Sequence, residues 1–143
     1  MDIFNTKNIT LNADVKSVQE AINAAGELLS LNGYVDSQYI NAMIQREGVI
    51  STYVGNGVAV PHGISGSDNL IFNSGISFLR TSSPILWGDE EARIVIGIAG
   101  KDGSHMDILG KIAMVCSDED NVAKLLNAET ADEVLRIFEE YEE

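Results

Sequence analysis

The segment Arg93–Ala99 reads RIVIGIA and is almost continuously apolar within this chain of 143 residues. A short β-branched run without polar alternation is typical of a central strand that is covered on both faces. The sequence GDEE at Gly88–Glu91, just before it, predicts a turn. We therefore expect a sheet with this segment near its middle.

Further strands are predicted upstream. Val49–Val54 and Val58–Val60 are short β-branched runs that Gly55–Gly57 separates, Leu70–Leu79 has a partly alternating apolar pattern, and Pro84–Trp87 is another candidate strand. Parallel neighbours need long crossover connections, so this close spacing means that some strands are antiparallel. The sequence predicts a mixed sheet.

Two helices are predicted before these strands. Asp14–Leu31 has apolar residues at helical spacing, with Asp14 as its cap and Asn32-Gly33 as its stop. Asp36–Gly48 predicts a second helix with Arg46 in its last turn. Its residues expected to be buried are Ile40, Met43 and Ile44.

The last third of the chain predicts helices again. Asp107–Cys116 has near-helical apolar spacing, and capping boxes at Ser117–Asp120 and Thr130–Glu133 predict two short helices. The last helix is expected to bury Val134, Ile137, Phe138 and Tyr141. Together these elements predict a single α/β domain over residues 1–143, with a mixed parallel and antiparallel central sheet flanked by helices on both faces.

The composition excludes several classes of protein. The formal net charge of −13 disfavours nucleic acids and anionic membranes and favours a partner with a basic face. The chain has no apolar run of the roughly 20 residues that a membrane helix needs. Met1–Asn5 lacks the pattern of a signal peptide, and the lone Cys116 excludes an internal disulfide. We expect a soluble cytoplasmic protein without direct membrane insertion.

The chain has only two histidines, and the first is His62. It follows GNGVAVP, in which glycines allow close approach of another molecule and Pro61 restricts the backbone just before the imidazole. A histidine at the end of a stiff strand is well placed to meet a partner. An ordinary turn histidine is the alternative interpretation.

The second histidine, His105, follows the buried strand and comes at the start of a helix. Such positions are common ligand sites in α/β folds, and a helix N-terminus favours an anion. A solvated residue at the helix start is the alternative. Arg46 suits the helix C-terminus by charge alone, or it could grip a phosphoryl group if it lies near His62.

Other chemistries find little support in the sequence. Two histidines and one cysteine, far apart, do not have zinc-ligand spacing. A nucleotide P-loop is absent, and no Gly-x-Ser-x-Gly elbow is present. Cys116 lies on the apolar side of its helix and is expected in the core. We expect neither a cofactor nor a metal.

The segment Arg46–Gly63, REGVISTYVGNGVAVPHG, resembles the signature of the mannitol/fructose class of enzyme IIA in the bacterial sugar phosphotransferase system. That signature combines Arg-Glu, Ser-Thr and Gly-x-Gly-[Val/Ile]-Ala-[Val/Ile]-Pro-His, and every element is present. Val95–Ala99, a polar loop and then His105 opening a helix also match. The resemblance covers nearly the whole chain.

The resemblance implies a phosphotransferase component with a phosphohistidine intermediate. His62 would accept a phosphoryl group on Nε2 from the phosphocarrier HPr and pass it to a cysteine on the IIB domain of a mannitol-type permease, IICB. His105 would lie beside His62 and hydrogen-bond the phosphoryl oxygens or the imidazole. Arg46 would offset the negative charge.

Ser51-Thr52-Tyr53 is similar to mannitol-type members, whereas most fructose-type and nitrogen-regulatory members carry Ser-Thr-Gly. The resemblance therefore favours mannitol as the sugar. Two other hypotheses stay open. The chain could be a regulatory module in which the phosphorylation state of His62 controls protein binding, or a non-catalytic binding domain in which both histidines are structural.

Overall fold

The computed structural model describes residues 3–140, and in this part of the chain five strands form one sheet in the order β1-β4-β5-β3-β2. The strands are Ile9–Ala13 (β1), Tyr53–Gly55 (β2), Val58–Ala59 (β3), Gly75–Trp87 (β4) and Glu90–Ala99 (β5). The pairs β1–β4 and β3–β5 are parallel, whereas β4–β5 and β2–β3 are antiparallel. The predicted mixed sheet is confirmed.

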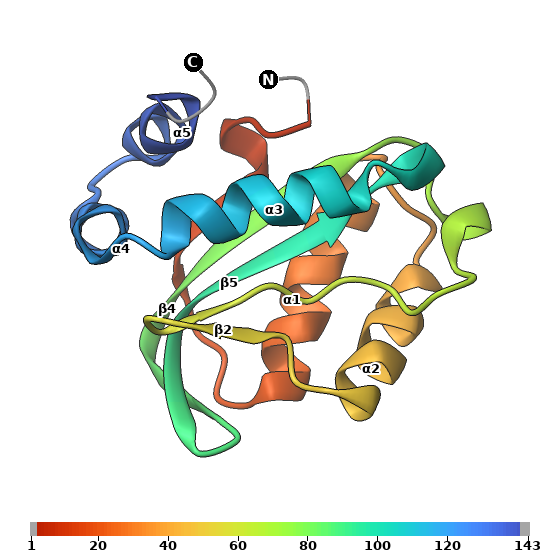
Figure 1. Ribbon diagram of the computed structural model, residues 1–143, viewed down its shortest axis with the longest axis horizontal. Helices are drawn as coiled ribbons and strands as arrows, with labels where there is room; N and C mark the ends of the chain where they lie inside the picture. The colour runs from red at the N-terminus through yellow and green to blue at the C-terminus, as the bar shows by residue number, and fades with distance from the viewer. Residues whose placement is uncertain (1–2, 141–143) are drawn as a thin grey trace.

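Helices cover both faces of this sheet, as predicted (Figure 1). The helices are Val18–Leu31 (α1), Tyr39–Val49 (α2), His105–Cys116 (α3), Glu119–Asn127 (α4) and Ala131–Glu140 (α5). Ile22 of α1 and Met43 of α2 belong to one buried cluster. Ile112, Leu125 and Phe138, from the last three helices, belong to a second buried cluster. Each cluster joins its helices to one face of the sheet.

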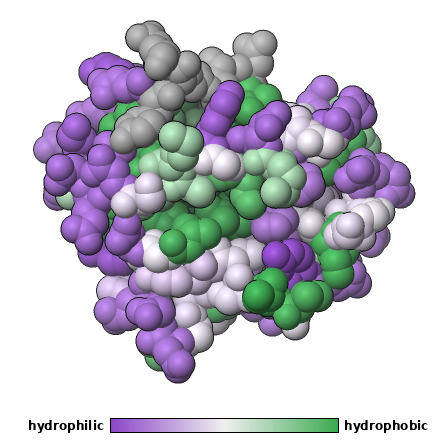
Figure 2. All heavy atoms as spheres, in the orientation of Figure 1, coloured by the Kyte–Doolittle hydropathy of each residue, from purple (hydrophilic) through white to green (hydrophobic). Residues whose placement is uncertain are grey.

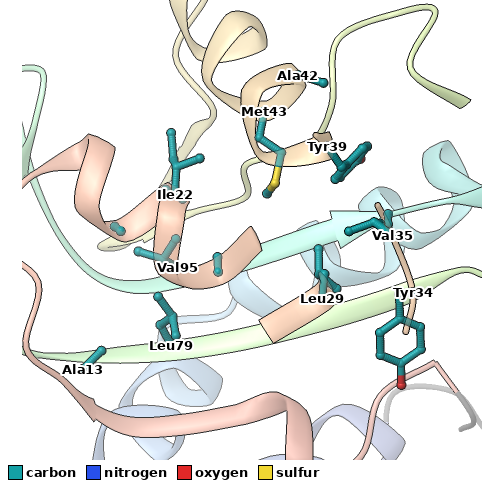
Figure 3. Close-up of a cluster of buried hydrophobic side chains, with 14 of the residues drawn as sticks. Ala13, Ile22, Leu29, Tyr34, Val35, Tyr39, Ala42, Met43, Leu79 and Val95 are labelled. Atoms are coloured by element: carbon teal, nitrogen blue, oxygen red, sulfur yellow. The ribbon is translucent and has the colours of Figure 1, made fainter. Parts of the chain in front are cut away.

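The strand β5 lies at the centre of the sheet, between β4 and β3. Successive side chains of a strand point to opposite faces. Val95 accordingly joins the cluster of α1 and α2, which Figure 3 shows, and Ile94 and Ile96 join the other. All three are fully buried, so the prediction of a strand covered on both faces is confirmed.

The helix α1 starts at Val18, so the predicted start at Asp14 is wrong. Ser17 is the N-cap, and its hydroxyl accepts the backbone N–H of Glu20 at 3.1 Å. The Glu20 carboxylate in turn accepts the N–H of the residue before Ser17, also at 3.1 Å. This capping-box arrangement ends the extended segment and begins the helix. The predicted stop is confirmed, because Gly33 adopts a φ of +83° just past the helix end.

The helix α2 begins at Tyr39 and ends at Val49, so it starts later than Asp36 and continues past the predicted end. The backbone N–H of Ile50 still donates to the Arg46 carbonyl at 3.4 Å. Helical hydrogen bonds therefore extend into the β-branched segment that was predicted as a strand. That strand forms only over residues 53–55, and its partner only over 58–59.

Burial along α2 follows the prediction in part. Met43 is fully buried, whereas Ile40 and Ile44 are partly buried. Arg46 lies in the last turn, as predicted. The position of α2 matters because its last turn carries Arg46 and because residues 50–52 then connect it to β2.

One long strand, β4, replaces the two segments that were predicted separately. The prediction of a strand over Leu70–Leu79 is wrong in its first half, because a 3-10 helix ends at Leu70 and β4 begins only at Gly75. Pro84–Trp87 is the far end of the same strand. The register with β5 shifts between Arg80 and Ile85. Proline cannot donate to a strand ladder, and here it lies within that irregular section.

The helix α3 starts at His105, before the predicted Asp107, and thus His105 opens a helix as expected. The predicted cap at Ser117 is wrong, because Ser117 follows the end of α3. Asp118 caps α4 instead, and its carboxylate accepts the N–H of Asp120 at 2.9 Å.

The predicted capping box of α5 is confirmed. The Thr130 hydroxyl accepts the N–H of Glu133 at 3.2 Å, and the Glu133 carboxylate accepts the N–H of Glu129 at 2.8 Å. Val134 and Phe138 are buried as expected and Ile137 packs against the same cluster, while Tyr141 lies outside the described residues. None of the helices within residues 3–140 is long and apolar enough to cross a bilayer.

Candidate functional site

His62 lies just beyond β3, at the edge of the sheet where the parallel strands β3 and β5 both end. A bridge pairs His62 with Ile98 of β5, and the backbone N–H of Ile98 donates to the Pro61 carbonyl at 3.0 Å. The carboxyl ends of parallel strands are a common place for ligand sites in α/β folds. The backbone of His62 is therefore fixed against the central strand at such an edge.

The imidazole of His62 is oriented by its own backbone. Its Nδ1 lies 2.9 Å from the carbonyl oxygen of Val60. A carbonyl oxygen only accepts hydrogen bonds, so Nδ1 must carry the proton. In the neutral ring the lone pair then belongs to Nε2.

His105 is the first residue of α3, and the structure places it beside His62. The two imidazole rings are stacked, with centroids 6.2 Å apart and planes 29° apart. A side chain at Gly100, between β5 and α3, would collide with the backbone and Cβ of His105. Glycine at this position therefore allows the start of α3 to lie close to the end of β5.

Arg46, from the end of α2, lines the same cavity as the two histidines. Its guanidinium donates to the Ile50 carbonyl at 2.8 Å, which uses one of its donors and leaves others for a ligand. The three residues singled out in the sequence are thus brought together from three elements.

These side chains line a cavity of about 460 Å³. Gly63, Ser67 and Asp68 contribute polar groups to its wall, and Met106 and Leu109 of α3 contribute apolar ones. A cation and two imidazoles around such a space form a site suited to a small anionic group.

Comparison with known proteins decides the family. The model of the family "Phosphoenolpyruvate-dependent sugar phosphotransferase system, EIIA 2" matches residues 2–141. The chain belongs to this family. Its members are components of a phosphotransferase, so the IIA chain described above is one as well.

Relatives of this IIA chain agree with the family. The mannitol-specific phosphotransferase enzyme IIA component of Halalkalibacterium halodurans is 46% identical over 141 residues, which cover 99% of this chain and 97% of the relative. That of Staphylococcus aureus is 43% identical over 139 residues, which cover 97% and 96%. Escherichia coli enzyme IIAMtl, solved in complex with phosphorylated enzyme IIBMtl, has a TM-score of 0.89 at 31% identity and covers 96% of this chain and 97% of that one. The resemblance to the mannitol-type IIA class is confirmed.

The surroundings of His62 lower its pKa below the ordinary value of 6.5. The largest cause is burial, which disfavours the charged ring. Arg46 and His105 lower the pKa further by charge, while the Val60 carbonyl and Glu47 act in the opposite direction. The net effect keeps the imidazole neutral at neutral pH, which is the state that has a lone pair on Nε2.

Tyr39 was not predicted as a site residue, yet it holds the loop beyond His62. Its hydroxyl accepts the N–H of Gly63 at 2.8 Å and donates to the carbonyl of Ile98 at 2.9 Å. Burial raises the pKa of Tyr39 to about 12, so the hydroxyl keeps its proton. A side chain at Gly63 would collide with the Tyr39 ring. The glycine after the histidine in the motif was the one sequence signal of this close packing.

Glu47 was quoted only as part of the motif, and no role was predicted for it. Its carboxylate accepts hydrogen bonds from the backbone N–H and the hydroxyl of Thr52, at 3.0 and 2.6 Å, and from the indole of Trp87 at 2.9 Å. Thr52 is buried, with 4% of its surface exposed. The Arg-Glu and Ser-Thr elements of the motif are therefore joined by hydrogen bonds.

Other candidate chemistries do not gather at this site. Within residues 3–140, no group of three or more His, Cys, Asp or Glu side chains is arranged to hold a metal ion. Cys116 is 2% exposed, and burial raises the pKa of its thiol to about 12. The prediction that Cys116 is a core residue is confirmed by this burial. A buried thiol with a raised pKa is also a poor nucleophile.

Proposed function

We propose that this chain is a phosphoryl carrier whose His62 accepts a phosphoryl group on Nε2 from phosphorylated HPr. It then passes the group to a cysteine on the IIB domain of a mannitol-type permease, IICB. The observation that carries the proposal is the contact of His62 Nδ1 with the Val60 carbonyl, which leaves the Nε2 lone pair free for bond formation. The family and its mannitol-specific relatives support the same assignment.

The chemistry of each transfer balances within the site. The Nε2 lone pair forms a P–N bond while the bond from phosphorus to the donor nitrogen breaks, and that electron pair returns to the donor. A ring that keeps its Nδ1 proton gains positive charge in this step, and the Val60 carbonyl stabilises that charge. In the second transfer a cysteine thiolate bonds to phosphorus, and the P–N pair returns to His62.

Arg46 and His105 act on the phosphoryl group in this proposal. Phosphoryl transfer needs in-line placement and stabilisation of charge on the equatorial oxygens, and demands little other chemistry from the protein. A guanidinium supplies fixed charge and several donors. His105 offers an imidazole N–H, and the backbone N–H groups at the start of α3 favour an anion.

The surface around the site suits a protein partner. Apolar side chains gather over α3 on the face shown in Figure 2, and the exposed residues of this helix include Met106 and Met114. An apolar contact around the transferring group excludes water, which would otherwise hydrolyse the phosphoryl intermediate. The net charge of −13 favours a donor with a basic face.

The proposal also covers the domain organisation, the cellular location and the partners of the chain. We infer that residues 1–143 act as one EIIA type 2 domain in the cytoplasm, without nucleic-acid partners, membrane insertion or a cofactor. The relatives at 43–46% identity are named mannitol-specific, and the solved neighbour was studied with enzyme IIBMtl. These names favour mannitol as the sugar and a mannitol IIB domain as the acceptor.

Reconstituted transfer tests the whole proposal. The chain, phosphorylated by enzyme I and HPr, is mixed in separate reactions with a mannitol-type and a fructose-type IIB domain, and phosphocysteine is measured. We expect fast transfer to the mannitol-type domain only, and none to a variant that lacks the acceptor cysteine. Phosphorylation without transfer to either domain would favour the regulatory module, and no phosphorylation would favour the non-catalytic binding domain.

A further inference from the structure

We propose that Glu47 is a positioning residue that holds the His62 imidazole in place for phosphoryl transfer, acting through Thr52 and Val60. The inference rests on the proposed carrier function of His62. It concerns a side chain that does not line the cavity and makes no hydrogen bond to the imidazole, although its charge acts on the pKa of His62. It also links the Arg-Glu element of the motif to the Ser-Thr element.

A continuous series of hydrogen bonds joins the two residues. Glu47 accepts both the backbone N–H and the hydroxyl of Thr52. The Thr52 carbonyl accepts the N–H of Val60 at 3.0 Å, and the Val60 carbonyl lies 2.9 Å from Nδ1 of His62. Both polar backbone groups of Val60 are therefore fixed, one by Thr52 and the other by the imidazole. The Ile98 contacts fix the backbone of His62, and the Val60 carbonyl, which Thr52 holds in place, fixes the orientation of its ring.

The carboxylate suits this task better than any neutral side chain. It offers two oxygens to three donors: two from Thr52 and one from the indole of Trp87 at 2.9 Å. A glutamine would present one oxygen, which can still accept the Thr52 N–H and the indole, and one NH2 group, which can only donate to the Thr52 hydroxyl. Replacing Glu47 by glutamine would therefore take the acceptor away from the Thr52 hydroxyl and remove the charge from these hydrogen bonds, which weakens the hold on the segment that carries Thr52.

Two consecutive residues at the end of α2, Arg46 and Glu47, have different roles. Glu47 holds Thr52, while Arg46 donates to the carbonyl of Ile50 at 2.8 Å and lines the cavity. The segment between α2 and β2 is thus fixed at two points. A purely structural contact would stabilise the fold in the same way, so the test needs a readout at the imidazole itself.

The tautomer of His62 is that readout. Nitrogen-15 NMR separates a protonated ring nitrogen from an unprotonated one, and the chain has only two histidines. In wild type we expect a single His62 tautomer with the proton on Nδ1. In Glu47→Gln and Thr52→Val we expect mixed tautomers, because the Val60 carbonyl no longer stays in place. Thr52→Ser, which keeps the hydroxyl, should restore the wild-type spectrum.

Transfer kinetics supply the second readout. Glu47→Gln should slow phosphoryl acceptance from HPr roughly tenfold to a hundredfold, as a misplaced reacting atom does, with an unchanged KM for HPr. Glu133→Gln is the matched control, since Glu133 also accepts a backbone N–H, at 2.8 Å, but lies in α5. The control should leave the rate and the tautomer unchanged.

The outcomes separate this inference from the proposed function. Wild-type phosphorylation with an unchanged rate and tautomer in Glu47→Gln and Thr52→Val would overturn the positioning role while His62 remained the carrier. A wild-type chain that accepts no phosphoryl group would overturn the carrier function, and the NMR comparison would still test the positioning of the ring. If Glu47→Gln does not fold, the pair Thr52→Val and Thr52→Ser gives the same test.

Discussion

The imidazole rings of His62 and His105 are stacked with their centroids 6.2 Å apart, although one follows β3 and the other opens α3. The parallel pairing of β3 with β5 produces this relationship, because it brings the ends of both strands to one edge of the sheet. A phosphoryl group on His62 would have the second imidazole beside it. The predictions below test what each neighbour contributes.

His105→Ala should fold and still accept a phosphoryl group, but it should transfer the group more slowly. Loss of one oriented donor near the transferring oxygens lowers the rate by roughly tenfold to a hundredfold. Rapid-quench measurements with HPr as donor and with the IIB domain as acceptor give both rates. Unchanged rates in both directions would remove His105 from the site.

Gly100→Ala should displace the start of α3, because the added methyl group would collide with the backbone of His105. We expect slower phosphoryl transfer and a loss of about 1–3 kcal/mol in the free energy of unfolding. The matched control is Gly110→Ala in α3, where an added methyl group meets no atom within 4 Å of those described. The control should gain roughly 0.5–1 kcal/mol and keep its rate. Equal behaviour of the two variants in denaturant and transfer assays would contradict the packing argument.

The titration of His62 should have its midpoint below pH 6.5, because burial lowers its pKa, with smaller contributions from Arg46 and His105. The neutral, nucleophilic ring therefore persists until the pH falls through that lowered pKa. Between this pKa and 6.5 the unfolded chain binds more protons, so the free energy of unfolding should fall as the pH drops through this window. Proton NMR of the two histidines, assigned with His105→Ala, measures the midpoint. A midpoint at or above 6.5 would contradict the expected environment.

Arg46→Gln should raise the pKa of His62, since the positive charge of Arg46 is one cause of its lowering. The same variant should accept phosphoryl groups roughly tenfold to a hundredfold more slowly, because it loses a fixed cation at the site. Arg136→Gln on the exposed side of α5 is the matched control. NMR titration and rapid-quench kinetics check both effects. If the two variants gave the same midpoint and rate, Arg46 would act only at the helix end.

Local patterns predicted the class of fold correctly, and their errors have physical causes. The apolar run at Arg93–Ala99 correctly predicted a central strand, because a strand that is buried on both faces requires apolar residues throughout. The start of α1 was misplaced because Asp14 and Ser17 are both good caps, and only Ser17 has a glutamate three residues later to complete a capping box. The β-branched residues at 49–50 favoured a strand, but the hydrogen bonds of α2 continue through them.

The sequence predicted which residues form the site, but it did not predict the hydrogen bonds that hold them in place. Motif and resemblance singled out His62, His105 and Arg46, and the structure brings all three to one cavity. The contact of Glu47 with Thr52 depends on how the chain turns after α2, and its contact with Trp87 depends on how the far end of β4 passes α2. The spacing of residues along the chain does not show that Glu47 and Trp87 lie close together. The sequence therefore predicted no role for Glu47 beyond its place in the motif.

Intact-mass analysis after incubation with phosphoenolpyruvate, enzyme I and HPr tests the central claim most directly, on wild type and on His62→Ala. We predict that wild type gains the mass of one acid-labile phosphoryl group and that His62→Ala gains none while it remains folded. A phosphoryl group on His62→Ala, or its absence from wild type, would contradict the assignment of His62 as the carrier.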